Sequence, residues 1–151
     1  MKKILTLFLL FSFVMNVEAS VEIGSVAPNF QLKAEDGKFY GLDKYPGKII
    51  VLEWLNHGCP FVRKHYDSGN MQALQQEYVH KGVVWLSIVS SAEGKQGHVD
   101  ASGAFREKQE NRSKATHVLL DPNGDAGRAY SAKTTPHMYI IDEEGKLVYQ
   151  G

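Results

Sequence analysis

The chain contains a single cysteine, Cys59, in a position that favours a reactive thiol. An apolar run and a short loop precede it, and it is followed by Pro60, the residue type favoured at the first position of a helix. Cys59 is therefore expected at the helix N-cap, where free N–H groups and the helix dipole stabilise a thiolate. Arg63, one helical turn further on, adds a positive charge. The alternative is a small buried hydrophobic residue, the usual role of an unpaired cysteine.

Glu53 and Pro136 are further candidates for the same site. Glu53 interrupts an apolar strand six residues before Cys59, and we expect it to accept a proton beneath the thiol. Its alternative is a strand end that faces solvent. Pro136 enters a strand, where it cannot complete the hydrogen-bond ladder, and X-Pro bonds are the common route to a cis peptide. A cis Thr135–Pro136 bond would place exposed backbone against the thiol and beside a substrate chain, whereas a trans proline would simply begin the strand.

Alternating apolar segments and turn signals predict the elements that position these residues. Val62, Tyr66, Leu74 and Tyr78 are expected to form one buried helical stripe, with a kink or a second helix start at 68–69. Together the elements predict an α/β fold, a mixed central sheet flanked by helices. The strands are expected at 30–33, 39–42, 49–55, 83–89, 118–120, 137–141 and 147–150, and the helices from Pro60 to about 80, at 104–111 and at 126–130.

The sequence stops at Gly151, directly after the last predicted strand. A sheet of this type needs helices on both faces, and the final helix of the pattern has no sequence to form it. We therefore expect the domain, residues 20–151, to be incomplete at its C-terminus. The alternative is that a partner covers one face of the sheet.

The N-terminal segment has the pattern of a signal peptide. Lys2 and Lys3 precede an apolar stretch at 4–17, and small residues up to Ala19 place cleavage after Ala19. Residues 1–19 are thus predicted to direct secretion or transport to the periplasm, with no stable membrane insertion after cleavage; a retained anchor helix is the alternative. Basic and acidic residues number 17 each, so no charge excess suggests a nucleic-acid partner.

Three segments carry a resemblance to a known family. The run from Val51 to Val62 resembles the active-site segment of the thioredoxin superfamily. Residues 24–30 and 135–142 resemble its redoxin branch, which holds the alkyl hydroperoxide reductase/thiol-specific antioxidant and peroxiredoxin-like proteins. The resemblance implies a thioredoxin-like fold, a buried acid at Glu53 and a cis-proline at Pro136.

Two departures from the family pattern narrow the expected chemistry. The second cysteine of thioredoxins is replaced by Val62, which excludes intramolecular dithiol cycling. Peroxiredoxins carry Thr or Ser three residues before the reactive cysteine and Pro seven before it; here these positions are Asn56 and Leu52. Asn56 retains the capacity to donate a hydrogen bond to a substrate.

The resemblance implies single-cysteine antioxidant or peroxidase chemistry on a small peroxide, completed by an external thiol reductant. Alternatives are exchange with a partner protein thiol through a mixed disulfide, and a non-catalytic binding domain. A metal site at His57, Cys59 and His65 matches no strong zinc spacing, so neither metal nor cofactor is expected. The candidate catalytic residues are Cys59, Glu53, Asn56 and Arg63, and the candidate substrate-contacting residues are Pro60, Thr135 and Pro136.

Overall fold

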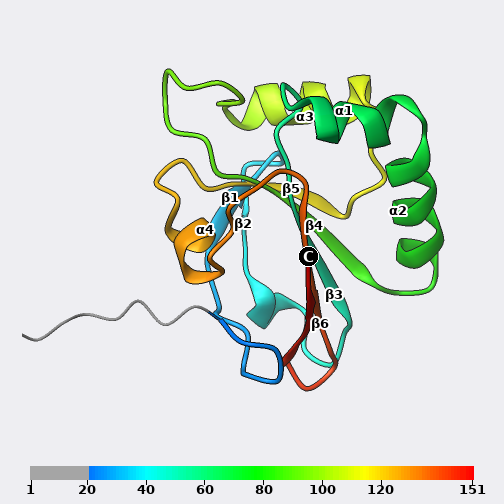
Figure 1. Cartoon of the computed structure of the whole chain (residues 1–151), viewed down its shortest axis with the longest axis vertical. Helices are drawn as coiled ribbons and strands as arrows, with labels where there is room; N and C mark the ends of the chain where they lie inside the picture. The colour runs from blue at the N-terminus through cyan, green and yellow to red at the C-terminus, as the bar shows by residue number, and fades with distance from the viewer. Residues whose placement is uncertain (1–20) are drawn as a thin grey trace, which may run out of the picture.

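The computed structural model describes residues 21–151, which form a seven-stranded mixed sheet with helices on both faces (Figure 1). This arrangement confirms the predicted α/β class. The predicted signal peptide lies outside the described residues and stays a prediction. In the described part of the chain, no helix has both the length and the apolar character needed to cross a membrane.

The strands follow the spatial order β2-β1-β5-β4-β3-β6-β7. β3 pairs with β4 and β4 with β5 in parallel, and the remaining pairs are antiparallel. The centre of the sheet is thus formed by strands that the sequence shows as apolar runs. The strands are β1 (Leu32–Ala34), β2 (Phe39–Tyr40), β3 (Ile50–Trp54), β4 (Val84–Val89), β5 (His117–Leu120), β6 (His137–Ile141) and β7 (Leu147–Gln150).

Every residue of β3 is buried, because both faces of the sheet are covered there. Val51 packs with residues of α1 (Pro60–Asp67), α2 (Asn70–His80) and α3 (Ala101–Glu110) on one face. Leu52 packs on the opposite face with residues of α4 (Asp125–Ala129) and the N-terminal segment. Figure 1 shows α4 separated from the other three helices by the sheet.

The predicted break at 68–69 is confirmed, since α1 ends at Asp67 and α2 begins at Asn70 after a left-handed Gly69 with φ 76°. The break resets the helical phase, so Met71 and Gln75 face the interior of α2. The prediction that the buried stripe extends beyond this break is therefore wrong. The side chains that it placed inside, Leu74 and Tyr78, are 37% and 41% exposed.

Leu74 and Tyr78 border an apolar groove of about 540 Å³ beside α2. Its floor is formed by side chains of β3, β4 and β6, including Val51, Trp85 and Ile140. The apolar character predicted for these positions is real, but the groove edge leaves them in contact with solvent.

Several boundaries differ from the sequence expectation; β1, for example, begins at Leu32 and not at residue 30. Helix α3 begins at Ala101, ahead of the predicted start at 104, because the Asp100 carboxylate accepts a hydrogen bond from Gly103 N at 2.7 Å and caps the first turn. β2 ends at Tyr40, and Leu42 instead begins a short 3-10 helix, Leu42–Lys44.

Candidate active site

Cys59 is the N-cap residue of α1, as predicted, with extended backbone angles of φ −77° and ψ 128°. Its carbonyl accepts the first helical hydrogen bond, from Arg63 N at 3.0 Å, and Pro60 occupies the first helical position. The sulfur is partly exposed and packs against the buried cluster that contains Val62 and Tyr66. A nucleophile in this position is open to solvent on one side and supported by the helix on the other.

The pKa of the Cys59 thiol lies below its ordinary value. The largest cause is a hydrogen bond with the Thr135 side chain, followed by the backbone N–H of Val62, and smaller contributions come from Phe61 N–H and the charge of Arg63. The N–H groups are the unpaired donors of the first helical turn. The helix N-terminus thus contributes to the lowered pKa, although no first-turn N–H group makes a capping hydrogen bond to the Cys59 side chain.

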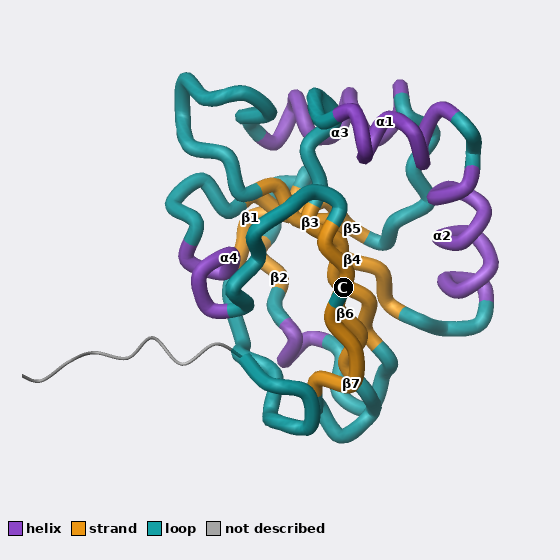
Figure 2. Tube along the Cα trace, in the orientation of Figure 1, coloured by secondary structure: helices purple, strands orange, loops and turns teal. Residues whose placement is uncertain are grey.

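The Thr135–Pro136 peptide bond is cis, which confirms one of the two alternatives raised by the sequence. The Cys59 sulfur lies 3.1 Å from the carbonyl oxygen of Thr135, and the protonated thiol donates to it. The structure therefore brings Cys59, Pro60, Thr135 and Pro136 together at one end of the sheet. Figure 2 shows the loop before β6 reaching this end, beside the start of α1.

Asn56 is held in the loop that precedes Cys59. Its Oδ1 accepts a hydrogen bond from Gly58 N at 2.8 Å, and its Nδ2 donates to the carbonyl of Gln96 at 3.3 Å. Gln96 Nε2 donates in turn to Gly58 O at 3.4 Å. The long loop between β4 and α3 thus fixes the cysteine loop. No pattern in the sequence pointed to Gln96, which lies 40 residues from Asn56.

Glu53 is fully buried, so the alternative of a strand end that faces solvent is wrong. Oε1 accepts from Tyr66 Oη at 3.0 Å, and Oε2 accepts from Trp85 Nε1 at 2.8 Å. Gln75 and Ser87 donate to Oε2 as well, at 3.1 and 3.0 Å. Burial nevertheless raises the pKa of Glu53 above its ordinary value, against the lowering effect of these donors. The sequence did not identify Gln75, a polar residue at an interior helical position.

His57 packs its ring edge-on against Tyr66, with 4.9 Å between the ring centroids. Its Nδ1 is buried without a hydrogen-bond partner among the described residues, and burial lowers the pKa of the ring. His65 Nδ1 instead pairs with Asn70 Nδ2 at 3.1 Å. Among residues 21–151, no group of three or more His, Cys, Asp or Glu side chains is arranged to hold a metal ion.

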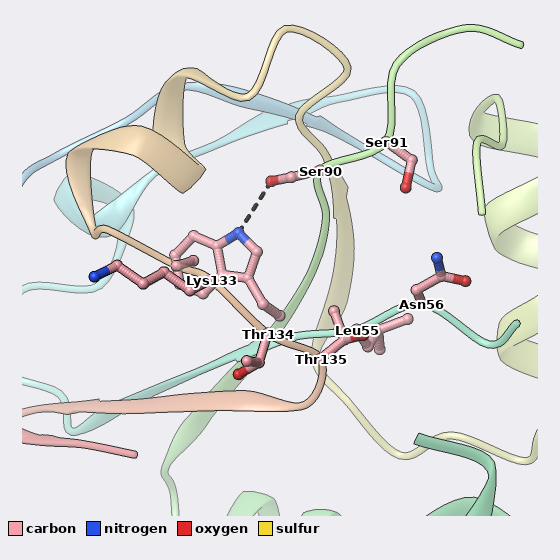
Figure 3. Close-up of a pocket in the computed structure, with 9 residues that line it drawn as sticks. Leu55, Asn56, Ser90, Ser91, Lys133, Thr134 and Thr135 are labelled. Atoms are coloured by element: carbon pink, nitrogen blue, oxygen red, sulfur yellow. Dashed lines mark hydrogen bonds between the residues drawn. The ribbon is translucent and has the colours of Figure 1, made fainter. Parts of the chain in front are cut away.

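A cavity of about 230 Å³ adjoins the site between the ends of β3 and β4 and the loop before β6 (Figure 3). Thr135 lines it, so the cavity and the thiol share one wall. The Trp54 side chain lines the cavity and is held in place by hydrogen bonds. Its Nε1 donates to Ser90 Oγ at 3.0 Å, and Ser90 Oγ donates to Asp121 Oδ2 at 2.6 Å. Figure 3 shows the Lys133 side chain extending away from Asn56.

Residues 23–150 match the AhpC/TSA family. The chain belongs to this family. Membership of the AhpC/TSA family confirms the resemblance drawn from the sequence, and its alignment spans every candidate site residue from Glu53 to Pro136.

Two kinds of relatives support the fold of this AhpC/TSA-family chain. It is 24% identical over 143 residues to the thiol-disulfide oxidoreductase ResA of Bacillus cereus, covering 95% of this chain and 77% of that protein. An uncharacterized conserved protein from Geobacillus kaustophilus has a crystal structure with a TM-score of 0.78 and 26% identity, covering 86% of this chain and 68% of the other. The exposed lipoprotein thioredoxin Etrx1 of Streptococcus pneumoniae gives a TM-score of 0.61 and 27% identity, with coverages of 82% and 88%. The thioredoxin-like fold is thereby confirmed.

Proposed function

We propose that this chain is an exported thiol oxidoreductase that exchanges disulfides through a mixed disulfide at Cys59. The observation that carries the proposal is the partly exposed Cys59 sulfur at the N-cap of α1, with a lowered thiol pKa. Relatives named as a thiol-disulfide oxidoreductase and as a thioredoxin support exchange as the reaction. The signal-peptide pattern of residues 1–19 and the name of the exposed pneumococcal lipoprotein support export.

In the proposed reaction, the Cys59 thiolate attacks one sulfur of a disulfide. The S–S bond of the substrate breaks, a new bond joins Cys59 to the attacked sulfur, and the other sulfur leaves as a thiolate that takes a proton from water. The chain has no second cysteine, so a thiol from outside must attack the mixed disulfide and restore Cys59. That thiol belongs to a small molecule or to a partner protein.

Pro60, Thr135 and Pro136 are the proposed substrate contacts, because Pro60 directly follows Cys59 and the carbonyl oxygen of Thr135, the residue before Pro136, lies 3.1 Å from the sulfur. Arg63 is proposed to stabilise the thiolate through its charge. The role of Glu53 as a proton acceptor stays a prediction. Oε2 accepts three hydrogen bonds and Oε1 accepts one, so Oε1 is the oxygen with an open position for a proton.

Peroxide reduction is the second candidate, supported by the AhpC/TSA family membership. The thiolate would attack a peroxide oxygen, the O–O bond would break, and Cys59 would become a sulfenic acid while water or an alcohol leaves. An external thiol would then condense with the sulfenic acid and release water. Asn56 Nδ2 donates one of its two hydrogens to Gln96 O, and the second is the one that could orient a peroxide. We rank exchange first because the curated relative is named as a thiol-disulfide oxidoreductase.

The test uses the reduced chain and bis(2-hydroxyethyl) disulfide, followed by intact mass spectrometry under non-reducing conditions. We expect one mixed disulfide per chain, absent in Cys59→Ser and removed by added thiol. A second sample receives hydrogen peroxide and dimedone, which labels a sulfenic acid. Failure to form the mixed disulfide while dimedone labels Cys59 would favour the peroxidase, and failure of both reactions would favour a binding domain without thiol chemistry.

A further inference from the structure

His137 is the first residue of β6 and directly follows Pro136. Its Nδ1 atom has two neighbours: Lys133 N at 3.3 Å and Tyr139 Oη at 3.1 Å. Tyr139 also donates its hydroxyl hydrogen to the carbonyl of Tyr130 at 2.9 Å, and its ring lies 4.6 Å from the His137 ring. The imidazole is thus attached both to the sheet and to the loop before β6.

A single ring nitrogen serves these two neighbours in different protonation states. With a lone pair on Nδ1, the ring accepts the hydrogen of Lys133 N–H. With a proton on Nδ1, as in the imidazolium, the ring loses that bond and donates to Tyr139 Oη instead. The tyrosine oxygen is available because its own hydrogen goes to Tyr130. Protonation therefore exchanges a bond to the loop for a bond within the strand.

The loop that His137 holds is the one that touches the thiol. Lys133 is two residues from Thr135, whose carbonyl oxygen lies 3.1 Å from the Cys59 sulfur. The Thr135 side chain is also the largest single cause of the lowered pKa of Cys59. A shift of this loop changes the contacts of the sulfur directly.

We propose that His137 is a positioning residue for the Cys59 reaction: its unprotonated Nδ1 holds the loop of Lys133 and Thr135 against the sulfur, and protonation releases it. This inference rests on the proposed thiol chemistry and adds its regulation by pH. His137 acts through Thr135 and has no contact with substrate in this assignment. Neither the family match nor the sequence spacing pointed to it, because an isolated histidine is more often a packing residue.

The surroundings of the His137 ring favour the unprotonated form, which holds the loop, at neutral pH. Burial, and to a smaller degree the charge of Lys133, lower the pKa of His137. Within the described chain, the titratable groups facing the ring are the Lys133 ammonium on the loop and the Tyr139 hydroxyl on β6. Trp54, its partner on β3, carries no charge. The loop is therefore expected to loosen only as the pH falls below the ordinary range for histidine.

The test measures the rate of Cys59 alkylation by iodoacetamide against pH, together with the thiolate absorbance. The wild-type profile should show two ionisations, one from Cys59 and one from His137. His137→Asn places an amide oxygen near the position of Nδ1, so it should keep the rate at high pH and show the Cys59 ionisation alone. His137→Ala loses the acceptor and should react roughly two- to tenfold more slowly at pH 7, with a raised Cys59 pKa.

The proposal is overturned if the wild-type profile has one ionisation, or if two persist in His137→Asn. Equal rates for wild type and His137→Ala would overturn it too, and so would a His137→Asn variant as slow as His137→Ala. Alkylation needs no disulfide or partner. A normal His137 effect on alkylation with no mixed disulfide formation would therefore contradict the proposed function while supporting the positioning role.

Discussion

The Cys59 sulfur meets the carbonyl oxygen of Thr135 at 3.1 Å, although 76 positions separate the two residues in the chain. The carbonyl accepts a hydrogen bond only from the protonated thiol, whereas the Thr135 side chain stabilises the thiolate. One residue thus contacts both protonation states of the nucleophile. The lowered pKa of Cys59 indicates that the thiolate contacts prevail.

Replacing Thr135 by Val removes its hydroxyl and keeps its carbonyl. The Cys59 pKa should rise, because the largest cause of its lowering is lost while the thiol keeps its acceptor. Alkylation at pH 7 should slow by roughly two- to tenfold, and absorbance titration of the thiolate measures the shift itself. Thr134→Val is the matched control, since this neighbour is exposed and should leave the pKa unchanged. An unaltered titration in Thr135→Val would assign the effect to the helix N-terminus instead.

Arg63→Gln removes a positive charge one turn from the thiol. The Cys59 pKa should rise slightly, since Arg63 is the smallest of the lowering causes and its side chain is exposed. We expect a rate loss of less than about threefold at low ionic strength, vanishing near 1 M salt because exposed charges are screened there. The same titration on Lys64→Gln, a charge change at the next residue, provides the comparison. A salt-independent loss would contradict a charge effect.

Gly97→Ala should disturb the cysteine loop. Gly97 has φ 83°, and a Cβ atom there would lie 2.6 Å from the Asn56 side chain. Gly94, with φ 74° and no atom within 4 Å of such a Cβ, provides a variant with the backbone cost alone. Gly94→Ala should lower the free energy of unfolding by about 1–2 kcal/mol. Gly97→Ala should lower it by more than this, and it should also alter the rate of Cys59 alkylation. Denaturant unfolding and alkylation rates of both variants test this. Equal stabilities and equal rates would show that the contact of Gly97 with Asn56 does not support the cysteine loop.

Glu53 should make the fold less stable as the pH rises. Its folded pKa is raised above the unfolded value near 4.5, so its contribution is complete below pH 4.5 and is lost as the pH rises through the folded pKa. The slope approaches about 1.4 kcal/mol per pH unit in that window. Glu53→Gln has no ionisation at this position and should lack the slope. Urea unfolding across pH 4–9 compares the two proteins, and parallel curves would show that Glu53 titrates alike in both states.

The path from β3 into α1 could be predicted from the sequence because its signals are local. A β-branched apolar run, a short loop and Pro60 are enough to place Cys59 at an N-cap. Glu53 was recognisable for the same reason, as an ionisable residue inside an apolar run. Pro136 identified the site of the cis bond, and the family resemblance implied the cis isomer that the structure has.

Other parts of the site depend on contacts that the sequence does not encode locally. The left-handed turn at Gly69 changes the phase of α2, so Gln75 faces Glu53 while Leu74 and Tyr78 border the groove. The contact of Gln96 with Asn56 arises from a loop whose path no periodicity describes. The spacing of hydrophobic residues predicts the buried face within one helix, but it cannot be extended across a break into the next helix.

The bond between Trp85 Nε1 and Glu53 Oε2, at 2.8 Å, gives the protein an intrinsic optical sensor. An indole bound to a carboxylate experiences a different electric field from one bound to a carboxylic acid, so its emission follows the charge of that acid. This measurement needs no label on the thiol. Trp54 emits in the same region, so in a Trp54→Phe variant the charge state of Glu53 can be followed in real time by ultraviolet fluorescence.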